Sequence, residues 1–227
     1  MRWILKPVNG QGGKGITYHR DMATLTATFA PCPPAKANAA ANRAAAGAVA
    51  LKDQYLVQEY LTKPLLLGGT KFDMRVYMII SSVNPLMVWY HPGYLRRALA
   101  PYSADSGDPR AHLTNTHFQY KSKEFRFKNH LWPMYLLTEE QAKEQPATLR
   151  RHLAEEGITG PHFVTSVLEP RMKRVLKFVA LSARDKLHAR RGAFQVFGMD
   201  FMVDAAFNVY LIEANGYVRS PRTPPLI

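Results

Sequence analysis

Short runs of apolar residues, each bounded by glycine, proline or polar residues, occupy the first half of the chain. Trp3 to Lys6 has the composition of a strand that leads into the glycine-rich segment NGQGGKG, and a second strand is expected near Ile16. β-Branched and aromatic residues predict further strands over Leu56 to Tyr60, Phe72 to Ser81 and Met87 to Tyr90. We therefore expect sheet to dominate the middle third of the chain.

A helical repeat follows in the segment from His162 to Arg190. Pro170 falls inside this repeat and is a candidate for a kink, because proline lacks the amide hydrogen that a helical hydrogen bond needs. We expect the repeat to form core rather than a site. Its apolar residues recur at helical spacing, at Val164, Val167, Leu168, Met172, Val175, Leu176 and Val179.

A hairpin is expected near the end of the chain. Its strands cover Phe194 to Val203 and Val209 to Asn215, and the residues from Ala205 to Asn208 form the turn. A tight turn centred within that segment pairs residues whose numbers sum to 413. Asp200 would then face Glu213.

Asp200 and Glu213 would place two carboxylates about 5 Å apart on one face, where their repulsion destabilises the sheet unless a cation compensates. Asn215 lies two residues beyond Glu213, so it points to the same face and adds a neutral oxygen. Oxygen ligands of this kind suit Mg²⁺, which one or two carboxylates commonly hold together with substrate phosphates. Two alternatives remain open: a solvated sheet face, or a one-residue register slip that separates the carboxylates.

The glycine-rich loop could cradle phosphates through the backbone amides around Gly12, Gly13 and Gly15, with Lys14 and Lys6 neutralising their charge. The spacing is neither that of a Walker loop nor that of a Rossmann fingerprint. A plain hairpin turn explains the glycines equally well.

Charged and apolar residues alternate in the segment KFDMRVY. Lys71, Asp73 and Arg75 therefore share one face of the expected strand, and apolar residues occupy the other. A solvent-exposed charged face is one explanation. We favour a nucleotide-binding face, because a phosphate loop and an acidic pair occur in the same chain.

The composition, with 47% hydrophobic and 21% charged residues, is that of a folded protein. One cysteine, Cys32, cannot form an internal disulfide, which favours a reducing compartment. The longest apolar stretch, Val76 to Tyr90, is too short and too interrupted to cross a bilayer, and no secretion signal follows Met1. The segment from Ala30 to Ala50 is rich in Ala, Pro and Asn and is expected to be an insertion without chemistry.

A formal charge of +13 favours anionic partners, among them nucleotides, nucleic acid and acidic protein tails. Phe125 and Phe127 alternate with charged residues in KEFRFK, which indicates either a nucleic-acid patch or a solvated basic loop. We favour the solvated loop.

Several motifs, in one order from Trp3 to Asn215, resemble the tubulin-tyrosine-ligase-like family: WILKP with its glycine loop, VQEYLTKPLLLGGTKFDMRVY, GYLRR, HLTN, FGMDF and LIEAN. The resemblance implies an α+β, ATP-grasp fold in which two lobes hold ATP between them. It implies a catalytic region over residues 1–227, with the insertion at about 30–50 and with the N-terminal lobe missing or truncated. The implied reaction is phosphorylation of a protein carboxylate by ATP, followed by attack of an amine on the acyl-phosphate.

The resemblance also implies roles for individual residues. Lys6 becomes a phosphate ligand, and Lys71 and Asp73 contact the nucleotide. The backbone of Gln58, Glu59, Tyr60 and Leu61 meets the adenine, and His112, Thr114 and Asn115 line the active site. Arg75 and Arg96 stabilise the γ-phosphate and the acyl-phosphate, and Asp200, Glu213 and Asn215 hold magnesium, with Glu213 also among the catalytic residues.

The implied cofactors are ATP and Mg²⁺, with a free amino acid as co-substrate. The implied partners are microtubules and the acidic tails of tubulin, in the cytoplasm and cytoskeleton, including the cilium or flagellum. HPGYLRR and HLTNTHFQYKS are closer to the glycylase-like branch, whereas Gly216 after Asn215 is similar to the tyrosine ligase. Tyrosination, polyglutamylation and polyglycylation stay open. The rival hypotheses are a non-catalytic microtubule-binding pseudo-ligase and a nucleic-acid-binding module.

Overall fold

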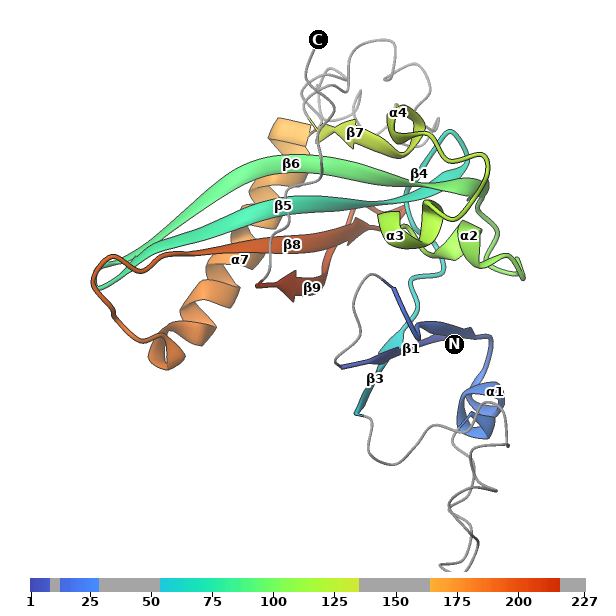
Figure 1. The fold of residues 1–227 in the computed structure, drawn as a ribbon, viewed down its shortest axis with the longest axis horizontal. Coiled ribbons are helices and arrows are strands. Elements are labelled where there is room, and N and C mark those ends of the chain that lie inside the picture. The colour runs from blue at the N-terminus through green and yellow to red at the C-terminus, as the bar shows by residue number, and fades with distance from the viewer. Residues whose placement is uncertain (9–12, 29–53, 135–163, 217–227) are drawn as a thin grey trace, which may run out of the picture.

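The computed structural model describes residues 1–8, 13–28, 54–134 and 164–216, which form a small and a large sheet (Figure 1). Cys32 and the insertion expected at Ala30 to Ala50 lie outside these residues. The small sheet has the order β2-β1-β3, with β1 at Trp3–Pro7, β2 at Thr17–His19 and β3 at Tyr55–Glu59. All three strands match the expected positions, and their pairing is antiparallel.

One short helix, α1 (Met22–Ala27), follows β2 in the small lobe. Asp21 caps its N-terminus, because the side chain of Asp21 accepts a hydrogen bond of 2.7 Å from the backbone amide of Thr24. Leu25 is buried and lies on the inner side of this helix. The small lobe is therefore a three-stranded sheet with one capped helical turn beside it.

The large sheet has the order β7-β6-β5-β8-β9, and β4 (Leu66–Leu67) pairs with β5. Its neighbouring strands are antiparallel. The strands are β5 (Thr70–Val83), β6 (Leu86–Pro101), β7 (Leu131–Pro133), β8 (Gln195–Val203) and β9 (Val209–Asn215). The expected strand at Met87 to Tyr90 was too short, because β6 continues to Pro101 and carries the GYLRR motif.

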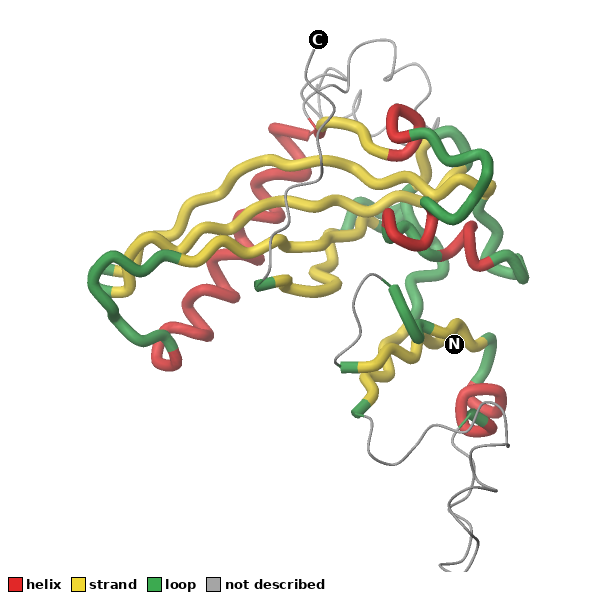
Figure 2. Tube along the Cα trace, in the orientation of Figure 1, coloured by secondary structure: helices red, strands yellow, loops and turns green. Residues whose placement is uncertain are grey.

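Helical segments cover one face of the large sheet (Figure 2). The expected long helix is divided into a π-helical turn (Val164–Leu168), α7 (Glu169–Ala183) and a 3₁₀ turn (Arg184–Lys186). It ends before Arg190, and Pro170 lies in the first turn of α7, where a missing amide hydrogen costs little. The expected apolar stripe is confirmed: it is buried or partly buried against the sheet.

Three short helices follow β6 at the end of the large sheet nearest the small lobe. They are α2 (Pro109–His112), α3 (Thr116–Gln119) and α4 (Phe127–His130). The expectation of a solvated loop at KEFRFK is wrong for Phe125, which is buried, and right for Phe127, which is exposed. No helix in the described ranges is long and apolar enough to span a membrane.

The last hairpin contains an irregularity that decides which residues face each other. Next to the turn the paired residue numbers sum to 412, as in Val203 with Val209. Beyond a bulge at Ile212 they sum to 413, so that Asp200 pairs with Glu213. The expected pair is therefore confirmed, although the turn is centred half a residue earlier than predicted. Both sheets are antiparallel and are accompanied by helices, a mixed α and β architecture consistent with an ATP-grasp-like fold.

Candidate nucleotide-binding cleft

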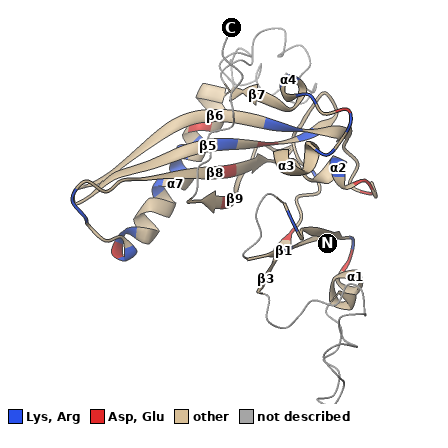
Figure 3. Ribbon diagram, viewed as in Figure 1, with Lys and Arg blue, Asp and Glu red and all other residues tan. Residues whose placement is uncertain are grey.

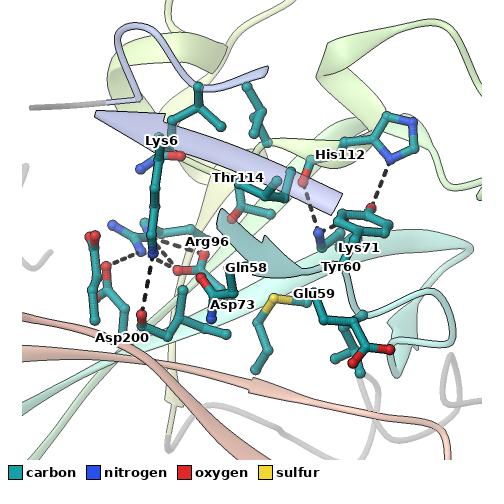
Figure 4. Close-up of a pocket in the computed structure, with 18 residues that line it drawn as sticks. Lys6, Gln58, Glu59, Tyr60, Lys71, Asp73, Arg96, His112, Thr114 and Asp200 are labelled. Atoms are coloured by element: carbon teal, nitrogen blue, oxygen red, sulfur yellow. Dashed lines mark hydrogen bonds and ion pairs between the residues drawn. The ribbon is translucent and has the colours of Figure 1, made fainter. Parts of the chain in front are cut away.

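A cleft lies between the small and the large sheet, and side chains from both lobes line it (Figure 4). Most of the predicted site residues meet there: Lys6, Gln58, Glu59, Tyr60, Leu61, Lys71, Asp73, Arg96, His112, Thr114, Asn115, Asp200 and Glu213. Five others lie outside this lining, namely Gly13, Lys14, Gly15, Arg75 and Asn215, and Gly12 is not among the described residues.

Sequence reasoning missed the apolar part of the lining. It consists of Ile4, Ile16, Leu113, Met202 and Ile212. The two-residue repeat of a strand could have identified two of these residues. Ile4 lies two positions before Lys6, and Met202 lies two positions after Asp200, so each shares a strand face with a predicted site residue. The cleft is therefore both charged and apolar, as sites for heterocyclic ligands commonly are.

Arg96 on β6 joins two buried carboxylates on the floor of the cleft. Its guanidinium donates to Asp73 on β5 and, at 2.8 Å, to Asp200 on β8. All three side chains are less than 10% exposed, so the exposed-face explanations are wrong for Asp73 and Asp200. Burial alone would raise the pKa of Asp200, but Arg75 and Arg96 outweigh it and hold that pKa below the ordinary value.

Arg75 lies directly opposite Asp200 in the β5–β8 ladder and donates to both of its carboxylate oxygens. Glycines on the two flanking strands leave space for Arg75. A Cβ atom at Gly198 would lie 3.0 Å from the guanidinium, and one at Gly93 would lie 2.0 Å from the carbonyl oxygen of Arg75. Gly93 falls at an irregularity of the β5–β6 pairing, where β6 has an extra residue.

Lys71 is the most deeply buried cation that faces the cleft. It is 4% exposed, and its ammonium donates to the carbonyl oxygen of His112 at 2.9 Å and to the hydroxyl of Tyr60 at 3.2 Å. The ammonium also lies 4.4 Å from the centre of the Tyr60 ring. Burial lowers the pKa of Lys71 to about 7, although Asp73 opposes the shift.

The contacts of His112 fix its tautomer. Its Nε2 lies 2.9 Å from the carbonyl oxygen of Ser106, which can only accept, so Nε2 carries the proton. Its Nδ1 therefore accepts from the hydroxyl of Tyr60 at 2.7 Å. Burial lowers the pKa of His112, which favours this neutral form. Lys71, Tyr60 and His112 thus form one directed chain of hydrogen bonds.

Tyr18 of the small sheet stacks on His112 of the large lobe, with 4.6 Å between ring centres. Its hydroxyl donates to the carbonyl oxygen of Ala104 at 2.7 Å, and Arg2 beside it forms an ion pair with Asp105. We call Arg2, Tyr18, Ala104 and Asp105 the clasp. It joins the two lobes at one end of the cleft.

A second contact crosses the cleft through Lys6. Its ammonium lies 3.5 Å from the carbonyl oxygen of Ile212, the extra residue of the β9 bulge. Figure 4 shows Lys6 reaching from the small sheet toward Asp200 and Arg96. Ile212 and Glu213 both line the cleft, at the point where the bulge interrupts the pairing of β9 with β8.

The glycine loop has the backbone conformation that its composition indicates. Gly13 and Gly15 have φ angles of +82° and +74°, in the region that favours glycine. A Cβ atom at Gly13 would lie 3.3 Å from the side chain of Asn115, so the loop approaches the HLTN segment closely. Lys14 is exposed.

The carboxylates proposed for magnesium occupy one region of the hairpin. Asn215 donates to Glu213 at 3.1 Å and to the carbonyl oxygen of Gly198, and Asp200 is the direct partner of Glu213. No group of three or more His, Cys, Asp or Glu side chains is placed to hold a metal within the described ranges. Two carboxylates and an amide nevertheless fit Mg²⁺, which completes its shell with water and phosphate oxygens.

A cleft between two lobes, lined by a buried lysine, a buried arginine and two buried carboxylates, has the charges that suit a polyanion with its counter-ion. Residues 1–222 match the model of the tubulin-tyrosine ligase family. The chain therefore belongs to the tubulin-tyrosine ligase family.

Three relatives illustrate the similarity to members of this family. The chain is 31% identical over 218 residues to the protein polyglycylase TTLL10 of Macaca fascicularis, an alignment that covers 94% of this chain and 33% of that protein. It is 30% identical over 218 residues to the inactive polyglycylase TTLL10 of Homo sapiens, covering 94% and 30%. It is 28% identical over 225 residues to the tubulin monoglycylase TTLL3 of Mus musculus, covering 98% and 22%. The chain spans a third or less of the length of these relatives.

Proposed function

We propose that this chain is the nucleotide-binding and catalytic region of an ATP-dependent carboxylate–amine ligase, with the cleft as the site between two ATP-grasp lobes. The observation that carries the proposal is that Lys6 and Lys71, from opposite lobes, line one cleft together with the buried Arg96–Asp73–Asp200 network. Two lysines facing two shielded carboxylates suit a triphosphate and its cation. Apolar Ile4, Ile16 and Met202 offer a surface for the base.

The proposed reaction transfers the γ-phosphoryl group of ATP to a carboxylate of the acceptor. The amine of the incoming amino acid then attacks the acyl carbon, and phosphate leaves as the amide forms. Arg96, which lines the cleft, would stabilise the charge that moves onto the transferred oxygens, and Arg75 would assist from behind Asp200. Asp200, Glu213 and Asn215 would hold Mg²⁺, which supplies charge neutralisation when bound.

The relatives support one of the amino acids that the sequence motifs left open. The names of the relatives described above contain polyglycylase or monoglycylase, so we propose glycine as the amino acid and tubulin as the acceptor. A net charge of +13 favours the encounter with glutamate-rich tubulin tails. The proposed location is the cytoplasm and cytoskeleton, including the cilium.

A second candidate function is a non-catalytic pseudo-ligase that binds microtubules. One observation favours it: a relative that is 30% identical is named an inactive polyglycylase. The two candidates differ at Glu213, because only the ligase needs a carboxylate there for magnesium.

The test is an incubation of the full chain with tubulin, ATP, Mg²⁺ and a mixture of Gly, Glu and Tyr, followed by mass spectrometry of the tubulin tails. We expect a glycine increment that disappears in Glu213→Gln. Asp185→Asn is the matched control, because Asp185 is an exposed carboxylate in the 3₁₀ turn that follows α7. A chain that binds microtubules but adds no amino acid would support the pseudo-ligase instead.

A further inference from the structure

The short helices after β6 carry a basic surface that the nucleotide site does not use. Residues 110–130 contain five Lys or Arg and a single Glu. Figure 3 shows Lys and Arg gathered at the α2 and α4 end of the large sheet. We call Arg110, Lys121, Lys123, Arg126 and Lys128 the basic surface.

Buried side chains hold this surface rigidly on β6. Gln119 is fully buried, donates to the carbonyl oxygen of Arg110 and accepts from the backbone amide of Leu99. His130 is also fully buried, and its Nδ1 donates to the carbonyl oxygen of Arg97 at 2.6 Å. These hydrogen bonds fix the backbone that carries the cations, so that binding has to order their side chains but not the backbone.

Most of the cations on this surface are not neutralised. Lys121, Lys123 and Lys128 are exposed and form no ion pair with any described residue. Arg110 pairs with Asp108 at 2.8 Å and lies 4.0 Å from Glu124. The surface thus has a net positive charge directed at solvent, which attracts carboxylates.

A hollow of about 420 Å³ opens within the basic surface. Arg110, Lys121, Lys123, Glu124, Ser122 and Phe118 line it. Asn115, which lines the cleft, and Phe118 are separated by one turn of α3, a rise of about 5 Å. An extended chain covers about 3.3 Å per residue, so a polypeptide leaving the cleft reaches the hollow within a few residues.

We infer that the basic surface holds the acidic stretch of the acceptor polypeptide, with the hollow receiving a carboxylate side chain close to the residue that is modified. The identity of the acceptor rests on the proposed function. The choice of this surface rests on charge complementarity. Nucleic acid fits less well, because Tyr120 and Phe127 pack edge-to-face or tilted around Phe125 instead of forming a stacking platform.

The test compares two double variants with the same change in net charge. Lys121→Glu/Lys123→Glu alters the hollow, and Arg174→Glu/Lys177→Glu alters exposed residues of α7. The probe is a fluorescein-labelled peptide of glutamate and glycine, with a glutamine-for-glutamate peptide as its neutral partner. We expect the hollow variant to weaken binding of the glutamate peptide about tenfold and the α7 variant to change it little. In ligation assays KM for the acceptor should rise while kcat stays unchanged.

The outcomes separate this inference from the proposed function. Equal behaviour of the two double variants overturns the acceptor surface, even if the wild-type chain ligates glycine. Selective loss of peptide binding in the hollow variant supports the surface, even if no ligation is detected. A poly-uridine oligonucleotide that binds more tightly than the glutamate peptide, through the same lysines, also overturns the inference.

Discussion

Arg75 and Asp200 lie directly opposite each other on neighbouring strands, and the guanidinium of Arg75 donates to both carboxylate oxygens of Asp200. The same carboxylate also accepts from Arg96. Two cations therefore already balance the charge of this buried carboxylate. Phosphate and magnesium would compete with this internal pairing, so nucleotide binding has to exchange ion pairs rather than only form them.

Gly93→Ala tests whether the close packing around Arg75 matters for stability. The new Cβ atom would lie 2.0 Å from the carbonyl oxygen of Arg75, and backbone cannot yield as a side chain can. We expect a loss of about 1–3 kcal/mol in the free energy of unfolding, measured by urea denaturation. Gly107→Ala is the control, because nothing lies within 4 Å of its added Cβ. Equal stability of the two variants would contradict the packing described.

Arg96→Met should destabilise the fold, because it leaves Asp73 and Asp200 facing each other in a buried position. The expected cost is about 3–5 kcal/mol at neutral pH. Arg110→Met, which breaks the more exposed pair with Asp108, should cost less than about 1 kcal/mol. Adding Asp73→Asn to Arg96→Met should recover part of the loss in the same denaturation experiment. If Asp73→Asn recovered none of the lost stability, repulsion between the two buried carboxylates would not be the cause of the loss in Arg96→Met.

Lys71 should make ATP binding depend on pH. Because burial lowers its pKa to about 7, Lys71 is mainly neutral at pH 8 in the free protein, and a bound phosphate would raise that pKa. We expect uptake of about one proton when ATP binds near pH 8. Calorimetry in buffers of different ionisation enthalpy measures this uptake, and Lys71→Met should abolish it. Unchanged uptake in Lys71→Met would assign the proton to another group.

The lowered pKa of Lys71 also makes the stability of the protein depend on pH. Unfolding returns Lys71 to its ordinary pKa of 10.5, so the unfolded state binds more protons between about pH 7 and 10.5. The contribution of Lys71 to the free energy of unfolding therefore becomes more favourable as pH rises through this window. Wild type and Lys71→Met should differ in their slope against pH there, and parallel curves would contradict the lowered pKa.

The clasp should control how firmly the lobes are joined. Arg2→Ala removes the ion pair to Asp105 and the hydrogen bond to Ala104. We expect faster amide hydrogen exchange in β2 and around residues 102–106, with weaker ATP binding and little change in α7. Lys177→Ala on the exposed face of α7 serves as the control. If exchange increased evenly throughout the chain, the substitution would have lowered global stability instead.

Periodicity predicted the parts of the site that depend on neighbours in sequence. The alternation in KFDMRVY correctly put Lys71 and Asp73 on one face, because both line the cleft whereas Phe72 and Met74 do not. The hairpin argument paired Asp200 with Glu213 although it assumed a regular ladder. The bulge at Ile212 could not be predicted, since nothing in the residue pattern distinguishes the extra residue from its neighbours.

The sequence pattern could not predict which distant segments pair with each other. Arg75 and Asp200 are 125 residues apart, and their contact depends on β5 choosing β8 as its neighbour. The stack of Tyr18 on His112 similarly needs two lobes to meet. Local composition says little about such choices, whereas the roles taken from the family resemblance already contained them implicitly. The individual roles of the site residues remain predictions.

The bulge at Ile212 has a consequence for how the site tolerates mutation. The contact of Lys6 with β9 uses a main-chain carbonyl oxygen, which no replacement of the Ile212 side chain removes. Loss or gain of a residue in β9 would instead change which groups face Asp200. Substitution scans of this strand will therefore underestimate its importance, and single-residue deletions and insertions are the changes that reveal it.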